Sequence, residues 1–172
     1  MNAALEYSHA VGAQPARRRW LAGAAGVAAL ASSPVRASTR RYDPGASDTE
    51  IAIGNIVPYS GPASAYGVIG RAVGAYFAKI NAEGGIAGRR IRYVSADDGY
   101  SPPRTVEQAR RLVEHEKVLF IAQVLGTAPN VAIQRYLNQR RVPQLFVATG
   151  ATRWGDPAQF PFTMGWQPSY QS

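Results

Sequence analysis

The chain has 172 residues, no cysteine and a formal net charge of +8. Without cysteine it can form no disulfide, thiolate metal site or thiol nucleophile. Residues 38–172 hold 15 basic and 10 acidic residues, a net charge of +5, so part of the basicity belongs to the first 37 residues. The remaining arginines are spread in pairs along the chain, which argues against a nucleic-acid-binding protein.

Residues 1–37 have the pattern of an export signal. Arginines 17–19 precede a weakly apolar stretch that ends at Ala31, and Val35-Arg36-Ala37 has the spacing of a cleavage site. The apolar stretch is shorter than the roughly 20 residues that span a bilayer, so we expect cleavage after Ala37 and a soluble exported product. The arginines before Trp20 favour the twin-arginine route, with a Sec signal as the alternative.

Beyond a polar, flexible lead-in at residues 38–49, strands and helices are expected to alternate. Short runs of branched apolar residues predict buried strands, and apolar residues at three- and four-residue steps predict helices. The expected strands are residues 51–57, 91–96, 118–124 and 144–148, and the expected helices begin at Gly67, Pro102 and Pro129. Residues 38–172 are enough for one α/β domain and too few for two.

This alternation with short connections predicts an α/β fold, a doubly wound parallel sheet of Rossmann-like topology. In such sheets the ligand crevice lies outside the carboxyl ends of the strands. Four loops are expected there, and all are rich in small and hydroxyl residues: residues 58–66, 97–101, 125–128 and 149–152.

Motifs of catalysis are scarce. The first strand is not followed by Gly-x-Gly-x-x-Gly, and the chain has no Gly-x-Ser-x-Gly elbow. His115 stands between two glutamates near a helix end, where a solvated histidine is the usual interpretation. Asp97-Asp98 precedes a glycine, which is ordinary turn chemistry. We therefore expect no enzyme, no metal and no cofactor.

The loops instead have the chemistry of binding. Gly126-Thr127 precedes a helix and can present amides and a hydroxyl to an anion. Gly150-Ala151-Thr152 offers similar groups from the next loop, and Tyr66 or Tyr59 can lay a ring against an apolar ligand group. For each residue taken alone, a turn or packing role is the favoured interpretation, but four such loops at one sheet edge favour a binding site.

Several segments resemble the type I periplasmic binding proteins of ABC transporters, the leucine/isoleucine/valine-binding group. They are residues 60–67, residues 80–89 with their Asn-x-x-Gly-Gly-Ile-x-Gly element, Asp97-Asp98 and residues 103–113. The resemblance implies a periplasmic substrate-binding component of an uptake transporter, with a permease and ATPase complex in the inner membrane as its partner. A ligand-sensing receptor of the same fold is the alternative.

The resemblance also implies a site. It assigns an aromatic contact with the ligand side chain to the first loop and contacts with the carboxylate and amino groups to the loops after the third and fourth strands. The matched residues are Tyr66, Gly126, Thr127, Gly150, Ala151 and Thr152. The implied ligand is a small carboxylate-bearing molecule: a branched-chain or other amino acid, an amide or an aromatic acid.

Two departures from the family pattern bear on function. A disulfide found in some members between the second and third loops cannot form here, because cysteine is absent. Members trap their ligand between two lobes, whereas residues 50–172 correspond to the N-terminal lobe and end where the hinge helix is expected. We expect a truncated half-site of this kind to bind weakly, because lobe closure contributes much of the usual affinity.

Overall fold

The computed structural model describes residues 41–172, and the export signal predicted for residues 1–37 lies outside the described residues. The helices and strands follow one another as β1 (Glu50–Val57), α1 (Gly67–Ala82), β2 (Arg90–Asp97), α2 (Pro102–Arg110), β3 (Phe120–Ala122), α3 (Thr127–Arg140), β4 (Gln144–Val147) and β5 (Thr163–Gly165). Short 3-10 helices stand at Ser64–Tyr66 (η2) and Thr152–Gly155 (η4), and a π-helical turn, Arg111–His115 (η3), extends α2.

The strands form one parallel sheet in the order β2-β1-β3-β4-β5. β1 is an interior strand and pairs with the edge strand β2 along its whole length, from Glu50 opposite Arg90 to Val57 opposite Asp97. Its other edge pairs with β3 at Ile53 and Gly54. The predicted fold class, a doubly wound parallel sheet, is confirmed.

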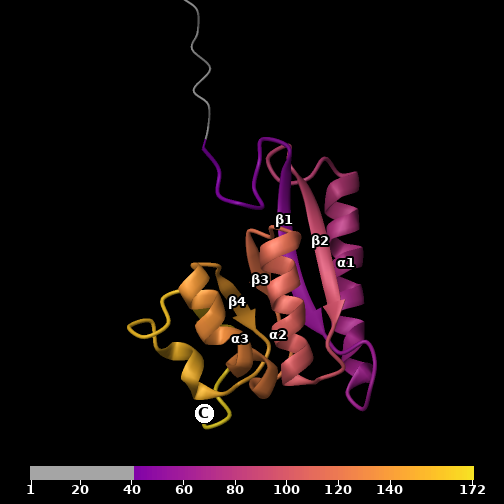
Figure 1. Ribbon diagram of the computed structural model, residues 1–172. Helices are drawn as coiled ribbons and strands as arrows, with labels where there is room; N and C mark the ends of the chain where they lie inside the picture. Colours follow the sequence, from indigo (N-terminus) through magenta and orange to yellow (C-terminus); the bar gives the residue numbers. More distant parts are fainter. Residues whose placement is uncertain (1–40) are drawn as a thin grey trace, which may run out of the picture. The chain divides into compact units, whose positions relative to one another are not determined.

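Alternating residues of β1 face different helices. Val57 approaches α1 so closely that a methyl group on Gly70 would lie 2.8 Å from its Cγ2. On the opposite face, a methyl group on Gly54 would meet Leu112 and Ile121 at 3.2 Å. Figure 1 shows α2 and α3 side by side in front of the sheet, with α1 along β2. Helices therefore cover both faces, as a doubly wound sheet requires.

The apolar core lies between the sheet and the α2–α3 pair. Its buried members come from β1, β3 and these helices with their flanking turns, and are Ala52, Ile56, Ala109, Leu112, Val118, Ile121, Val124, Ile133 and Leu137. Ala109 and Leu112 in α2 and its extension η3, and Ile133 and Leu137 in α3, recur at the three- and four-residue steps that place them on one helix face. Packing on this face fixes where the following loops begin.

The third strand is shorter than predicted. Only Phe120–Ala122 is extended, because Gln123 adopts a positive φ of 55°. The buried Asn55 of β1 holds this bend by donating from Nδ2 to the carbonyls of Ala122 and Gln123, at 2.9 and 3.2 Å. The third helix correspondingly starts at Thr127 rather than Pro129.

A fifth strand was not predicted from the sequence. β5 has only three residues and follows Pro161, so it shows no periodic pattern. Hydrogen bonds to neighbouring elements hold it in place. The backbone N–H of Gln144 donates to the Phe162 carbonyl at 2.7 Å, and Asn138 Oδ1 accepts the Phe162 N–H at 2.9 Å.

Part of the predicted lead-in folds back onto the sheet. The Ser47 amide donates to the Glu50 carbonyl at 2.9 Å, and the Ala52 amide donates to the Gly45 carbonyl at 2.7 Å. Gly45 approaches the backbone of residues 117–119, where no side chain would fit. None of the helices formed by residues 41–172 has the length and hydropathy needed to cross a membrane.

Candidate functional site

The carboxyl ends of the parallel strands bring the four predicted loops to one edge of the sheet. β1 and β2 end level with one another, at Val57 and Asp97, and their arrowheads point the same way in Figure 1. β3 and β4 reach the same edge, where Leu125 forms a parallel bridge with Ala148. The loops after β1, β2, β3 and β4 therefore surround one surface, which we call the carboxyl edge.

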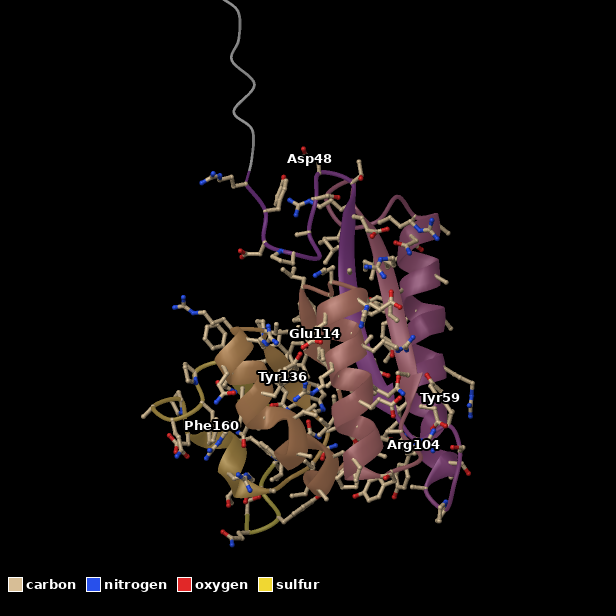
Figure 2. All side chains as sticks on the ribbon, viewed as in Figure 1. Asp48, Tyr59, Arg104, Glu114, Tyr136 and Phe160 are labelled. Carbon is tan, nitrogen blue, oxygen red and sulfur yellow. The ribbon has the colours of Figure 1, made fainter. Side chains whose placement is uncertain are left out.

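Asp97 joins the first two loops of the carboxyl edge. Its Oδ1 accepts the backbone N–H groups of Tyr59, Ser60 and Gly99 at 2.8, 3.1 and 3.0 Å, and its Oδ2 accepts the Ser60 hydroxyl at 2.5 Å. Arg104 approaches the same oxygen at 3.3 Å, and Figure 2 labels it close to Tyr59. Burial acts to raise the pKa of Asp97, but the hydrogen bonds outweigh it and lower the pKa to about 2.

Asp98, the neighbouring carboxylate, is buried and also has a structural role. It accepts the Tyr100 N–H at 2.9 Å and the Thr105 hydroxyl at 2.7 Å, which ties the loop to the first turn of α2. The two carboxylates thus hold backbone in place, in line with the turn interpretation of Asp97-Asp98. Within the described residues, no group of three or more His, Asp or Glu side chains forms a metal site.

Tyr66 stands at the end of η2, immediately before α1. Its side chain is 55% exposed, in the loop that Asp97 anchors. The ring is therefore available at the carboxyl edge for a contact with a ligand.

Gly126 and Thr127 form the start of α3. Gly126 has a φ of 90°, and a Cβ there would lie 2.4 Å from Cε2 of Tyr100. Its amide donates to the Ala148 carbonyl at 3.2 Å, and its carbonyl accepts Nδ2 of Asn130 at 2.7 Å. The backbone groups of Gly126 are thus already paired, and what the residue provides is close approach between the second and third loops.

Thr127 is linked to the fourth loop through a side chain that the sequence did not single out. Its hydroxyl oxygen lies 2.6 Å from that of Thr149, which is buried. The predicted groups of the third and fourth loops are thereby brought together at the carboxyl edge.

Gly150, Ala151 and Thr152 follow and lead into η4. Thr152 is exposed, and its hydroxyl has no hydrogen-bond partner among residues 41–172. The Gly150 carbonyl, in contrast, accepts the Tyr170 N–H at 2.8 Å, and the Tyr170 ring covers the glycine so closely that a Cβ would meet Cδ1 at 2.7 Å.

Tyr170 itself was missed by sequence reasoning. Its hydroxyl lies 3.0 Å from Oγ1 of Thr149, so it belongs to the same hydroxyl cluster. The residue lies in a C-terminal segment outside the helices and strands of the sheet, 20 residues from Gly150 in sequence, and neither periodicity nor a motif marks it.

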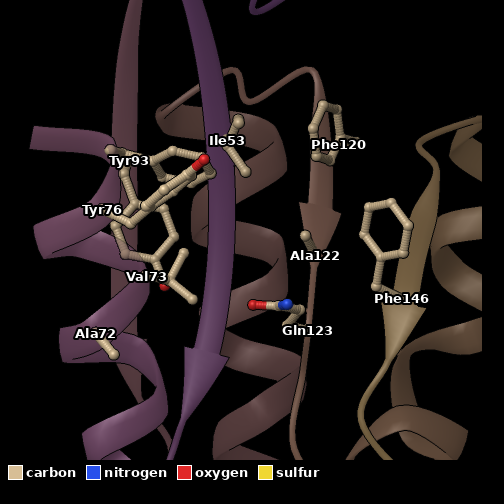
Figure 3. Close-up of a pocket in the computed structure, with 10 residues that line it drawn as sticks. Ile53, Ala72, Val73, Tyr76, Tyr93, Phe120, Ala122, Gln123 and Phe146 are labelled. Carbon is tan, nitrogen blue, oxygen red and sulfur yellow. The ribbon is translucent and has the colours of Figure 1, made fainter. Parts of the chain in front are cut away.

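A separate apolar pocket of about 460 Å³ lies on the α1 side of the sheet, away from the predicted site residues. Figure 3 shows aromatic rings from α1, β2, β3 and β4 around it, with the Gln123 amide between them. The lining residues are Ile53, Ala72, Val73, Tyr76, Phe77, Tyr93, Phe120, Ala122, Gln123 and Phe146. None of the six predicted site residues is among them, so this pocket is distinct from the carboxyl edge.

In comparison with protein families, residues 50–172 match the family described as "Periplasmic binding protein". No curated protein matches the chain.

Solved structures share the fold. A substrate-binding periplasmic protein from Ralstonia solanacearum is 31% identical, with a TM-score of 0.62, over 72% of this chain and 35% of its own. A possible leucine/isoleucine/valine-binding protein from Rhodopirellula baltica is 24% identical, with a TM-score of 0.64, over 76% of this chain and 34% of its own. The chain thus spans about a third of the length of these structures.

A third structure also shares the fold. The branched-chain amino acid transporter substrate-binding protein LivJ from Streptococcus pneumoniae, solved with isoleucine, is 23% identical, with a TM-score of 0.62, over 70% of this chain and 34% of its own. At this identity the likeness concerns the fold.

Proposed function

The chain belongs to the periplasmic binding protein family, and from this we propose that it provides a ligand-binding lobe of the substrate-binding component of an ABC uptake transporter. The observation that supports this most is the family match across residues 50–172, the same residues that build the sheet and all four loops of the carboxyl edge. The ligand would bind there, in the position that open α/β sheets favour.

The proposed contacts use the groups that remain available at this edge. Thr152 offers an exposed hydroxyl, and Thr127 and Ala151 stand at the starts of α3 and η4, where the first N–H groups of a helix have no intrahelical partner. Tyr66 offers an exposed ring for an apolar or planar ligand group. Gly126 and Gly150 contribute small size and close packing of the loops rather than free polar groups.

We propose a small carboxylate-bearing ligand. Among structures with this fold, LivJ was solved with isoleucine, and a solute-binding protein from Rhodopseudomonas palustris was solved with 3,4-dihydroxybenzoic acid. Both molecules bear a carboxylate, which suits hydroxyls and helix-start amides. They differ in the rest of the molecule, so an amino acid and an aromatic acid are the two probes to compare.

The proposal extends to location and partners. Export by residues 1–37, with cleavage after Ala37, would deliver the protein to the periplasm, where residues 50–172 would act as a binding lobe behind the segment 38–49. Its partner would be a permease and ATPase complex in the inner membrane, and we propose no enzymatic activity.

Thermal unfolding of the purified chain tests the ligand class. A ligand that binds the folded state raises the unfolding midpoint in a concentration-dependent way. We expect isoleucine or 3,4-dihydroxybenzoate to raise it, and Thr152→Ala to reduce the rise, because this variant removes the exposed hydroxyl of the carboxyl edge.

Thr49→Ala is the matched control, since Thr49 is an exposed threonine at the opposite end of β1. It should keep the full rise. An equal rise in both variants would place the ligand elsewhere, and no rise with either carboxylate would exclude the proposed ligand class.

A further inference from the structure

Three hydroxyls form a chain across the carboxyl edge. Thr127 lies on the first turn of α3, Thr149 follows β4, and Tyr170 reaches over from the C-terminal segment. Their oxygens are 2.6 Å apart between the two threonines and 3.0 Å apart between Thr149 and Tyr170. Thr149 is 2% exposed, whereas Tyr170 is 73% exposed, so the chain runs from the interior to the surface.

The number of hydroxyl protons limits the directions that the hydrogen bonds among Thr127, Thr149 and Tyr170 can take. Thr149 has one hydroxyl proton and can donate it to only one of its two neighbours. If it donates to Tyr170, it accepts from Thr127, and the Tyr170 proton is left for an external acceptor. Hydrogen bonding with Thr149 lowers the pKa of Tyr170.

The backbone holds Tyr170 in position. Its N–H donates to the Gly150 carbonyl at 2.8 Å, and its ring lies against Gly150, where a Cβ would come within 2.8 Å of Cε1. The hydroxyl is therefore fixed beside the fourth loop, although the side chain remains open to solvent. A donor that is positioned in advance loses less freedom when it binds a ligand.

We propose that Tyr170 is a further ligand-binding residue of this site and that its hydroxyl donates a hydrogen bond to the ligand carboxylate. This rests on the proposed function, because it requires the ligand to occupy the carboxyl edge. Thr127 and Thr149 act as positioning residues that orient the Tyr170 proton outward, and hydrogen bonds in series strengthen one another. Tyr170 would thereby favour anionic ligands over neutral ones.

Titration calorimetry on the full chain tests the role of Tyr170, with isoleucine and 3,4-dihydroxybenzoate as probes. Tyr170→Phe keeps the ring on Gly150 and removes only the hydroxyl. Loss of a hydrogen bond to a charged group should weaken the binding of the carboxylate probe roughly ten-fold. Tyr76→Phe, on α1 and also exposed, is the matched control and should bind as the unmodified chain does.

A second measurement follows Tyr170 directly. With tyrosine labelled by ¹³C at Cζ, the resonance that disappears in Tyr170→Phe is that of Tyr170, and the carboxylate probe should shift it. A retained affinity in Tyr170→Phe, or an unmoved resonance while the probe binds, overturns the inference and leaves the proposed function standing. Tighter binding by Tyr170→Phe also overturns it, because Tyr170 would then compete with the ligand. Binding of neither probe to the unmodified chain overturns both proposals.

Discussion

The hydroxyl oxygens of Thr127 and Thr149 lie 2.6 Å apart and join the start of α3 to the loop after β4. The two residues are 22 positions apart in sequence. Their contact exists because β3 and β4 are parallel neighbours that end at the same edge. Two loops of the proposed site are thus held in register by side chains as well as by the sheet.

Valine substitutions measure this contact. Thr127→Val or Thr149→Val replaces the hydroxyl with a methyl group and should lower the free energy of unfolding by about 1 kcal/mol, since each leaves the other hydroxyl short of a partner. The double variant should cost less than the two single costs together, with a coupling energy of roughly 0.5–1 kcal/mol. Urea unfolding of the unmodified protein, the two single variants and the double variant completes this double-mutant cycle. Strictly additive costs would show that the hydroxyls do not interact in solution.

The close approach at Gly126 makes a second prediction. Gly126→Ala adds a Cβ both at a φ of 90° and 2.4 Å from the Tyr100 ring, so we expect a loss of about 2–4 kcal/mol in the free energy of unfolding. Gly84→Ala is a matched control, because Gly84 has a φ of 102° but no atom within 4 Å of the added Cβ. That variant should lose only about 1 kcal/mol, from backbone strain.

The denaturant midpoints of Gly126→Ala and Gly84→Ala separate the cost of backbone strain from the cost of the steric clash with Tyr100. Equal losses would mean that the Tyr100 ring moves aside without cost. In that case the second and third loops would be less firmly joined than the contact suggests.

Local sequence pattern predicts the larger part of this fold. The branched apolar runs of β1, β2 and β4 and the apolar stripes of the helices are visible without structural information, and the family inferred from the motifs is confirmed by the match over residues 50–172. One of these motifs is explained by packing: Asn81 accepts the Ile91 N–H and donates to the Ile91 carbonyl, at 2.7 and 2.8 Å, so it joins α1 to β2.

What sequence could not predict depends on contacts between distant residues. The bend at Gln123 is held by Asn55, 68 positions away, and β5 is held by Gln144 and Asn138. Tyr170 contacts the fourth loop through its backbone bond to Gly150 and through its hydroxyl, which lies near Thr149. The six predicted site residues are still predictions as ligand contacts, although the sheet brings their loops to the same edge.

A buried amide network beneath the carboxyl edge makes a third prediction. Asn130 is fully buried and donates from Nδ2 to the carbonyls of Val124 and Gly126, both at 2.7 Å, while its Oδ1 accepts Nε2 of Gln144 at 2.7 Å. Asn130→Ala leaves three buried polar groups without these partners. We expect the free energy of unfolding to fall by roughly 2–4 kcal/mol.

Gln139→Ala is the control for Asn130→Ala, because it removes an exposed amide from the same helix and should change stability by less than about 0.5 kcal/mol. Chemical denaturation gives both values. Native-like stability in Asn130→Ala would mean that water replaces the lost amide.

The low pKa of Asp97 makes the free energy of unfolding depend on pH in the acidic range. The folded-state pKa is about 2, below the ordinary 3.8, so the folded protein favours the carboxylate more than the unfolded chain does. This stabilisation is complete above about pH 4 and is lost as the pH falls from there towards 2. The shift corresponds to at most about 2.5 kcal/mol, and the partial exposure of the side chain reduces this to roughly 1 kcal/mol.

Asp97→Asn removes the titrating group while keeping the shape of the side chain. The variant should be less stable than the unmodified chain at pH 6, and the difference should shrink as the pH falls from 4 to 2. Glu107→Gln, which removes an exposed carboxylate of α2, is the control. Urea midpoints at each pH supply the comparison. The prediction is wrong if the stability difference between Asp97→Asn and the unmodified chain does not change with pH. Asp97 would then titrate normally, and its hydrogen bonds to Tyr59, Ser60 and Gly99 would not hold the first two loops together in solution.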